Sequence, residues 1–286
     1  MVGRIANIPR VLFEDIVRQA LIEDLGRGGD LTTDSIVDPG VQFKGRIVAR
    51  QAGRMAGGAI AALAFELMDA SVRIMQTQED GTALEPGATL MTVEGPARAI
   101  LSAERTALNF LGRLSGIATL TAGYIEAVAG RGAGIVCTRK TTPGLRTLEK
   151  YAVRCGGGAN HRFGLDDAVL IKDNHLAVAG SIEEAVARVR KNIGHTVKVE
   201  LEVDTLKQLE QALAVGVDIV LLDNMKFETL KTAVEMVDGR AITEASGGIT
   251  LETAAEIAAT GVDYLSVGAL THSAPCLDVG LDAEEG

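Results

Sequence analysis

Residues 197–222 read VKVELEVDTLKQLEQALAVGVDIVLL and contain one complete unit of strand, helix and strand. A β-branched run at 197–203 precedes an amphipathic stretch at 205–215, and a second apolar run follows Gly216. Glycine is typical of the residue just after a helix, because it adopts positive φ without steric cost. Alternation of this kind indicates a parallel sheet whose strands are connected by helices.

The same alternation extends through the second half of the chain. It predicts strands at 135–137, 168–171, 197–203, 219–222, 241–243 and 264–267, and helices at 181–192, 205–215, 227–237 and 250–259. Ser181 is the expected N-cap of the first of these helices. The number of units favours a closed or nearly closed α/β barrel. The pattern alone leaves an open doubly wound sheet as an alternative.

Residues before about 115 follow a different pattern and predict a separate N-terminal domain. Strands are expected at 45–50, 72–77 and 89–93, with a packed helix within 57–70 and a long helix opening at Ser102. Arg113 on that long helix is expected to be a solvated charge. A first helix should end near Gly26 and bury one apolar face, made of Leu12, Phe13, Ile16, Val17, Ala20 and Leu21.

Composition is that of a cytoplasmic enzyme. The chain has 286 residues, 47% of them hydrophobic, which is enough for a barrel and a smaller domain. No apolar run is long enough to span a bilayer, and no secretory signal is visible. Cys137, Cys155 and Cys276 have no metal-ligand spacing and are expected to be reduced thiols. A net charge of −10 disfavours nucleic acid as a partner.

Positive charge is nevertheless concentrated between Arg139 and Arg162. This stretch holds six Lys or Arg residues and one acid, Glu149. Guanidinium groups match planar carboxylates and phosphates, so a cationic stretch in an acidic protein indicates a small polyanionic ligand.

Charged and polar residues also close the predicted strands. In a parallel barrel these strand ends meet on one face, where active sites lie. Lys172 there could be a Schiff-base nucleophile in an aldolase-like barrel. Local ion pairs, Lys172 with Asp173 or Glu202 with Lys198, are the simpler interpretation. The residues that end the strands are Arg139, Lys140, Lys172, Glu202, Asp223, Glu244, Ser246 and Gly268.

Two glycine-containing turns follow the last two strands. Ser246, Gly247 and Gly248 form the first, and Val267, Gly268 and Ala269 the second. Backbone N–H groups can approach a phosphate closely at glycine, and phosphate sites recur at the last strands of α/β barrels. The pair of turns therefore predicts a phosphate site.

Several longer motifs resemble those of quinolinate phosphoribosyltransferase, the decarboxylating nicotinate-nucleotide pyrophosphorylase of NAD biosynthesis. The resemblance covers nearly the whole chain, and its motifs are long and specific. They are EDL at 23–25, GDLTT at 29–33, ERTALN at 104–109, LSGIAT at 114–119, TRKTTPGLR at 138–146, KYAVR at 150–154, GGGANHR at 156–162, LIKDNH at 170–175, LLDN at 221–224, SGGI at 246–249 and LDVGLD at 277–282.

The resemblance implies an N-terminal α/β sandwich domain at 1–115, an incomplete TIM-like α/β barrel at 116–270, and a tail at 271–286 that returns to the N-terminal domain. It implies transfer of phosphoribose from phosphoribosyl pyrophosphate to quinolinate, with Mg²⁺, giving nicotinate mononucleotide, pyrophosphate and CO₂. It also implies a homodimer with shared active sites, or a hexamer built from such dimers. Relatives that use nicotinate, a paralogue associated with molybdenum transport, and a non-catalytic ligand sensor are the alternatives.

The resemblance also assigns roles to residues of this sequence. Arg105 from the neighbouring subunit, with Arg139, His161 and Arg162, would hold the quinolinate carboxylates, and Thr138 would line the same site. Lys140 and Lys172 would lie near a carboxylate and the pyrophosphate. Glu202 and Asp223 would face the ribose hydroxyls and the metal, directly or through water. The residues matching the 5′-phosphate turns are Ser246, Gly247, Gly248, Val267, Gly268 and Ala269.

Overall fold

The computed structural model describes residues 8–284, which form two compact units. The first unit contains the chain up to Ala122, Thr141–Gly157 and the chain from Ala269 onward. The second contains Gly123–Lys140 and Gly158–Gly268. Among the described residues, no helix has both the length and the apolar character needed to cross a bilayer.

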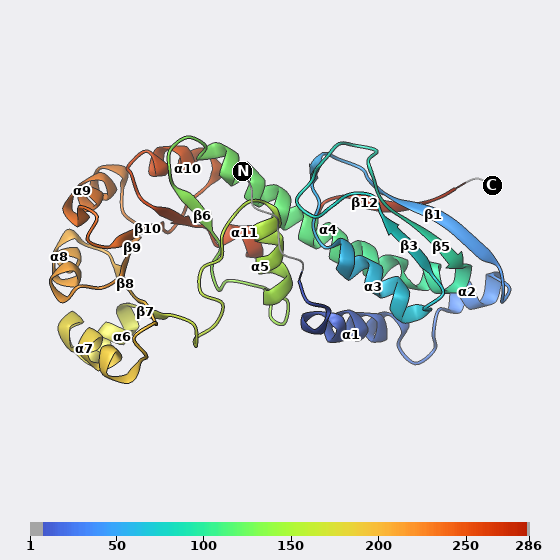
Figure 1. Cartoon of the computed structure of the whole chain (residues 1–286), viewed down its shortest axis with the longest axis horizontal. Helices are drawn as coiled ribbons and strands as arrows, with labels where there is room; N and C mark the ends of the chain where they lie inside the picture. Colours follow the sequence, from blue (N-terminus) through green and yellow to red (C-terminus); the bar gives the residue numbers. More distant parts are fainter. Residues whose placement is uncertain (1–7, 285–286) are drawn as a thin grey trace. The chain divides into compact units, whose positions relative to one another are not determined.

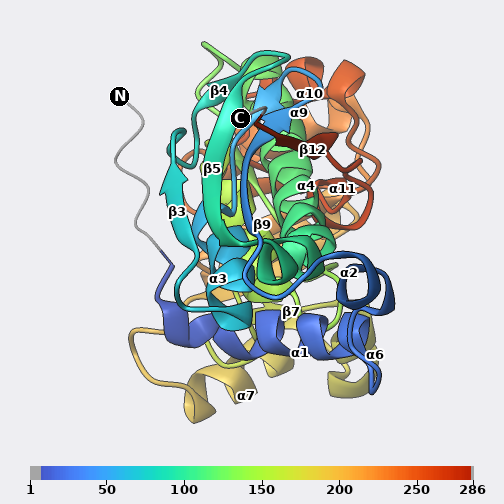
Figure 2. The ribbon, with the colours of Figure 1, turned by 90° about the vertical axis from the view of Figure 1, so that its right-hand side faces the viewer.

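The first unit is built on a four-stranded antiparallel sheet in the order β12-β1-β5-β3 (Figures 1 and 2). The last strand of the chain pairs with β1, with Gly45 opposite Ala283. The C-terminal segment is therefore part of this sheet. The strands are β1 (Gln42–Ala49), β3 (Arg73–Gln76), β5 (Thr89–Pro96) and β12 (Val279–Ala283), and a separate pair is formed by β2 (Gly53–Arg54) and β4 (Ala83–Leu84).

Of the predicted apolar face, Phe13, Val17 and Leu21 are buried, and Ile16 and Ala20 are half-buried. Leu12 is 51% exposed, so the prediction was wrong there, because Leu12 belongs to the 3-10 turn before the helix. The helical elements of this unit are η1 (Arg10–Leu12), α1 (Glu14–Leu25), α2 (Leu31–Ile36), α3 (Gly58–Met68), α4 (Ala97–Ala127), α5 (Arg146–Cys155) and α11 (Ala269–His272).

The long helix α4 begins at Ala97 and not at Ser102, because β5 runs directly into it at Pro96. Its Gly116 is required by packing, since a Cβ atom there would lie 1.9 Å from the carbonyl oxygen of Pro275. Arg113 is not the solvated charge that the sequence predicted. It forms an ion pair with the fully buried Glu149.

The second unit is a six-stranded parallel sheet in the order β6-β11-β10-β9-β8-β7. From β7 to β11 the order follows the chain, which is the order of a barrel and not of a doubly wound sheet. The described strands leave β6 and β7 unpaired with each other, so the barrel is incomplete. The strands are β6 (Gly134–Val136), β7 (Val169–Ile171), β8 (Val199–Val203), β9 (Ile219–Asp223), β10 (Ile242–Ser246) and β11 (Tyr264–Ser266).

The helices of this unit pack along the outside of the sheet (Figure 1). Ser181 caps its helix as predicted, because its side chain accepts a hydrogen bond from the backbone N–H of Glu184. Gly216 ends another helix with a left-handed φ of 70°. The helices are α6 (Asp173–Ala179), α7 (Ile182–Asn192), α8 (Leu206–Val215), α9 (Phe227–Val237) and α10 (Leu251–Ala258).

The free edge of β6 is lined by the chain around Ala159. The backbone N–H of Ala159 donates to Ile135 O at 2.8 Å, and Cys137 N–H donates to Ala159 O at 3.2 Å. These hydrogen bonds hold Ala159 beside β6, and they thereby fix where the following residues His161 and Arg162 lie. The basic stretch is divided between the units, since α5, with Arg146, Lys150 and Arg154, belongs to the first and Arg139, Lys140 and Arg162 to the second.

Candidate active site

Strand register places the acidic residues of the second unit on one face of the sheet. Glu202 and Glu244 both pair with Leu221, and Asp223 pairs with Ser246. Side chains alternate along a strand, and paired residues of a parallel sheet point to the same side. Glu200, Glu202, Asp223, Glu244 and Ser246 therefore share the face of the sheet.

Lys172 follows β7 and contacts Glu202. Its Nζ atom donates a hydrogen bond to Oε2 of Glu202. Ile171 pairs with Leu201, so Lys172 and Glu202 come next on the two neighbouring strands. The sequence suggested local ion pairs of Lys172 with Asp173 and of Glu202 with Lys198. In the structure Lys172 and Glu202 contact each other instead. A lysine whose Nζ atom is engaged in an ion pair is a poor Schiff-base nucleophile, which argues against the aldolase interpretation.

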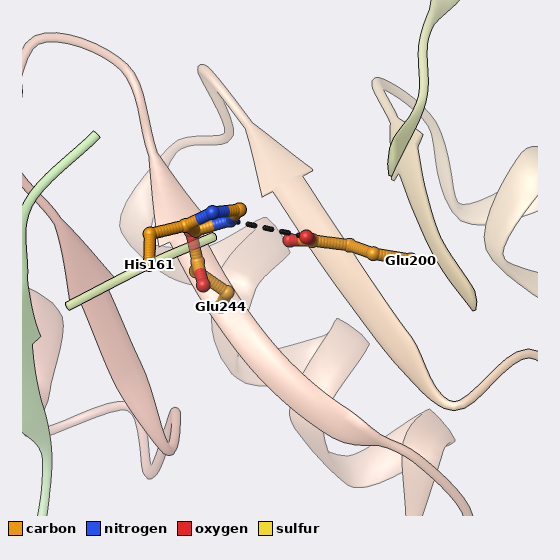
Figure 3. A group of neighbouring side chains, drawn as sticks. All are labelled: His161, Glu200 and Glu244. Atoms are coloured by element: carbon orange, nitrogen blue, oxygen red, sulfur yellow. Dashed lines mark ion pairs between the residues drawn. The ribbon is translucent and has the colours of Figure 1, made fainter. Parts of the chain in front are cut away.

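His161 lies between two buried acids (Figure 3). Its Nε2 atom is 3.0 Å from Oε2 of Glu200 and 3.5 Å from Oε1 of Glu244. Its Nδ1 atom accepts a hydrogen bond of 2.7 Å from the backbone N–H of Arg162. An accepting Nδ1 atom carries no proton, so this network assigns the ring proton to Nε2, which donates to Glu200.

Glu200 and Glu244 are 3% and 5% exposed. Burial, followed by the negative charge of Glu200, raises the pKa of Glu244 to about 7, although His161 opposes the shift. Two neighbouring buried carboxylates, here those of Glu200 and Glu244, favour a state in which one of them is protonated. Glu200 was absent from the sequence-based site, but its place two residues before Glu202 on one strand was the signal for it.

These three residues are also the group in the described chain that comes close enough to hold a metal ion, with ligand atoms within 4.8 Å of one another. The hydrogen bonds argue against a metal there, because a metal would need the Nε2 lone pair. Glu202 and Asp223, the pair expected to bind the metal, lie on the same face but outside this group.

Two arginines provide the positive charge of the site. Within the described residues, the Nε atoms of Arg139 and Arg162 are buried and make no hydrogen bond. Arg162 also donates from Nη1 to Ala168 O at 3.0 Å. Burial, and then the charge of Arg139, lower the pKa of Arg162. Two partly buried guanidinium groups that repel each other favour the binding of an anion, such as a carboxylate or a phosphate.

The other predicted residues are placed as follows. Lys140 is exposed, and its backbone N–H donates to the Thr138 hydroxyl at 3.0 Å. Val267 is buried and bonds to β6 through Val136 O at 2.9 Å. His175 caps α6 by accepting from the backbone N–H of Lys172, a structural role.

Arg105 lies on the exposed surface of α4 in the first unit, whereas the other predicted site residues, Ala269 excepted, belong to the second. Ala269 begins α11 of the first unit. Gly247 and Gly248 have φ values of 92° and 61°, in the region that glycine favours.

This arrangement of charges on an α/β barrel is typical of enzymes that act on anionic small molecules. Two family models identify the family. "Quinolinate phosphoribosyl transferase, N-terminal domain" matches residues 30–115, and "Quinolinate phosphoribosyl transferase, C-terminal domain" matches residues 117–282. The chain belongs to the quinolinate phosphoribosyl transferase family, which confirms the family predicted from its motifs.

Individual relatives agree with this assignment. The chain is 48% identical over 273 residues to nicotinate-nucleotide pyrophosphorylase [carboxylating] of Mycobacterium leprae (strain TN), covering 94% of this chain and 96% of that protein. It is 46% identical to the probable enzyme of the same name from Bacillus subtilis (strain 168), covering 93% and 92%. The crystal structure of NadC from Streptococcus pyogenes matches with a TM-score of 0.93 at 41% identity, covering 98% of this chain and all of that one. These matches confirm the predicted fold class.

Proposed function

We propose that this protein transfers phosphoribose from phosphoribosyl pyrophosphate to the ring nitrogen of quinolinate and removes one carboxyl group as CO₂. The products are nicotinate mononucleotide and pyrophosphate, in NAD biosynthesis. Family membership supports the reaction class, and the arginine pair Arg139–Arg162 is the structural observation that supports a diacid substrate.

Binding of quinolinate is assigned to the arginines. A site for two carboxylates needs more guanidinium groups than a site for one, and Arg139 and Arg162 offer two adjacent forks. Neutralising the carboxylates in fixed positions leaves the ring nitrogen oriented for attack, so positioning contributes much of the rate. His161, held through both ring nitrogens, fixes the backbone from which Arg162 extends.

Transfer of phosphoribose is assigned to the acids Glu202 and Asp223 and to the lysines Lys140 and Lys172. Departure of pyrophosphate builds positive charge on the ribose ring and negative charge on the leaving group. Glu202 and Asp223 would face the ribose hydroxyls and stabilise the first charge. Lys140 and Lys172 would stabilise the second. The contact between Lys172 and Glu202 places groups of both signs side by side.

Mg²⁺ is part of the proposal. Carboxylate oxygens are the ligands it prefers, and it keeps several waters. Glu202 and Asp223, on neighbouring strands, fit a site in which carboxylates hold the ion directly or through water, together with substrate oxygens. When bound, the ion would neutralise charge on the pyrophosphate. The 5′-phosphate would bind at Ser246, Gly247 and Gly248 and at Val267, Gly268 and Ala269, where strand ends meet turns.

Decarboxylation needs no organic cofactor in this scheme. Attachment of the ribose makes the ring nitrogen cationic, so the electron pair left on the adjacent carbon is stabilised by the substrate itself. The carbon then takes a proton.

A homodimer in which Arg105 reaches the partner's site is also proposed, with a hexamer built from such dimers as the larger assembly. Its support is that Arg105 is exposed on α4 and lies in the other compact unit. A cytoplasmic location is proposed from the sequence, whose three cysteines are an odd and scattered set with no metal-ligand spacing.

A turnover assay tests the proposal. Purified protein with Mg²⁺, phosphoribosyl pyrophosphate and quinolinate should form nicotinate mononucleotide and CO₂ in equal amounts. Replacing quinolinate by nicotinate should give little product. If the protein turned over nicotinate but not quinolinate, it would be one of the phosphoribosyltransferases that use nicotinate. Binding of both substrates without product would indicate a ligand sensor.

A further inference from the structure

Asn224 follows β9 directly and has an unusual backbone conformation. Its φ is 51°, and Asp238, with φ 46°, is the other non-glycine residue with positive φ in the described chain. Residues with a Cβ atom enter this region only where the surroundings hold them there, and asparagine and aspartate tolerate it best. Asp238 ends a helix, whereas Asn224 lies beside the proposed sugar site.

Asn224 connects two strands through two hydrogen bonds. Its side-chain Nδ2 atom donates to Oδ2 of Asp223 at 2.6 Å. Its backbone N–H donates to the carbonyl oxygen of Ser246 at 2.9 Å. One residue therefore contacts both the carboxylate that ends β9 and the end of β10.

The glycine turn packs against the same side chain. A Cβ atom on Gly247 would lie 2.1 Å from Oδ1 of Asn224 and 2.6 Å from its Cγ atom. The next residue, Gly248, has no heavy atom within 4 Å of such a position. Gly247 is thus required by contact with Asn224 as well as by its φ of 92°.

We infer that Asn224 is a positioning residue that holds the Asp223 carboxylate and the Ser246–Gly248 turn in a fixed relation to each other. The inference rests on the proposed function, in which Asp223 faces the ribose hydroxyls and the turn binds the 5′-phosphate. The ribose hydroxyls and the 5′-phosphate belong to one phosphoribose. The distance between Asp223 and the turn therefore decides whether both parts of the ligand can be bound together. The hydrogen bond to Oδ2 restrains the Asp223 carboxylate and would leave its Oδ1 atom for the ribose hydroxyls or the metal.

Asn224→Gly is the decisive variant, because glycine adopts a φ of 51° without strain and the change removes only the side chain. A lost hydrogen bond to a charged group corresponds to a rise of ~10-fold or more in the KM for phosphoribosyl pyrophosphate. The KM for quinolinate should stay within about twofold, since the arginine pair is untouched. Asp238→Gly is the matched control at the other positive φ and should leave both constants unchanged.

One further variant separates the possible failures. Asp223→Asn should abolish most activity; if it does not, the proposed role of Asp223 fails independently of Asn224. If Asp223→Asn is inactive while Asn224→Gly has a wild-type KM for phosphoribosyl pyrophosphate, the positioning role is wrong.

The packing contact has its own readout, which needs no substrate. Gly247→Ala should lower the Tm clearly in the wild-type protein and less in the Asn224→Gly background. The cost of placing alanine at a φ of 92° is common to both backgrounds and cancels in this cycle. Equal losses of Tm would show that Asn224 does not determine the requirement for Gly247 and would overturn the inference.

Discussion

Arg113 forms an ion pair with the buried Glu149 within the first unit, with 2.8 Å between Nη2 of Arg113 and Oε1 of Glu149. Glu149 is fully buried and also accepts hydrogen bonds from the backbone N–H and the hydroxyl of Thr142, at 3.0 and 2.8 Å. The carboxylate therefore joins α4, α5 and the loop that follows Thr141. Its role is structural, although it is the one acid in the basic stretch of the sequence.

Replacing Glu149 by alanine should destabilise the protein by about 3–5 kcal/mol, because the guanidinium of Arg113 would remain largely buried without its partner. Urea unfolding of both proteins measures the difference. Glu184→Ala, which removes an exposed pair with Arg188, is the control and should cost less than about 0.5 kcal/mol. A loss as small as that of the control would mean that water replaces the contacts of Glu149.

Glu244 predicts a dependence of stability on pH. Its pKa is raised from 4.5 to about 7, so folding favours the neutral form. The stability contributed by this group is fully present below pH 4.5 and is lost as pH rises through about 7. The glutamine of Glu244→Gln stays neutral at every pH. The free energy of unfolding of this variant, minus that of the wild type, should therefore increase by on the order of 3 kcal/mol from pH 5 to pH 8. Parallel curves for the two proteins would contradict this assignment.

Arg162→Lys tests whether the shape of the guanidinium group matters. Lysine keeps the charge but cannot present a planar fork to a carboxylate. The KM for quinolinate should rise by roughly 10-fold or more, with little change in the KM for phosphoribosyl pyrophosphate. Arg188→Lys on the outer helix α7 serves as a control. An equal rise in both Michaelis constants would indicate a general disturbance of the barrel.

Arg105 provides a test of the shared site. Arg105→Ala and Arg139→Ala should each lose most activity with quinolinate. In a mixture of the two, random exchange of subunits would give heterodimers with one intact site, so up to about one quarter of wild-type activity should return. Mass spectrometry of tagged subunits would establish that exchange took place. Absence of recovery after confirmed exchange would show that Arg105 acts within its own chain.

Local features of the sequence were sufficient for most elements of the second unit. The predicted helix at 227–237 has the bounds of α9, and the caps at Ser181 and Gly216 are formed as expected. Caps depend on residues within one turn of the helix, which is why the sequence reveals them. Leu12 and the start of α4 were misplaced, because neighbouring elements determine those positions.

The acids at the strand ends were also predictable, since alternation along a strand fixes the side to which each residue points. Their partners were not. Three contacts join residues through strand register or loop path: Lys172 with Glu202, His161 with Glu200 and Glu244, and Asn224 with Ser246.

By itself the sequence determined the family, the strand and helix types and the residues with the required chemistry, because these depend on local pattern and on motifs. Only the tertiary structure decided that Arg113 pairs with the buried Glu149, that His161 lies between Glu200 and Glu244, and that Gly247 packs on Asn224. Such relations depend on distances between segments far apart in the chain, which packing sets and local sequence does not encode.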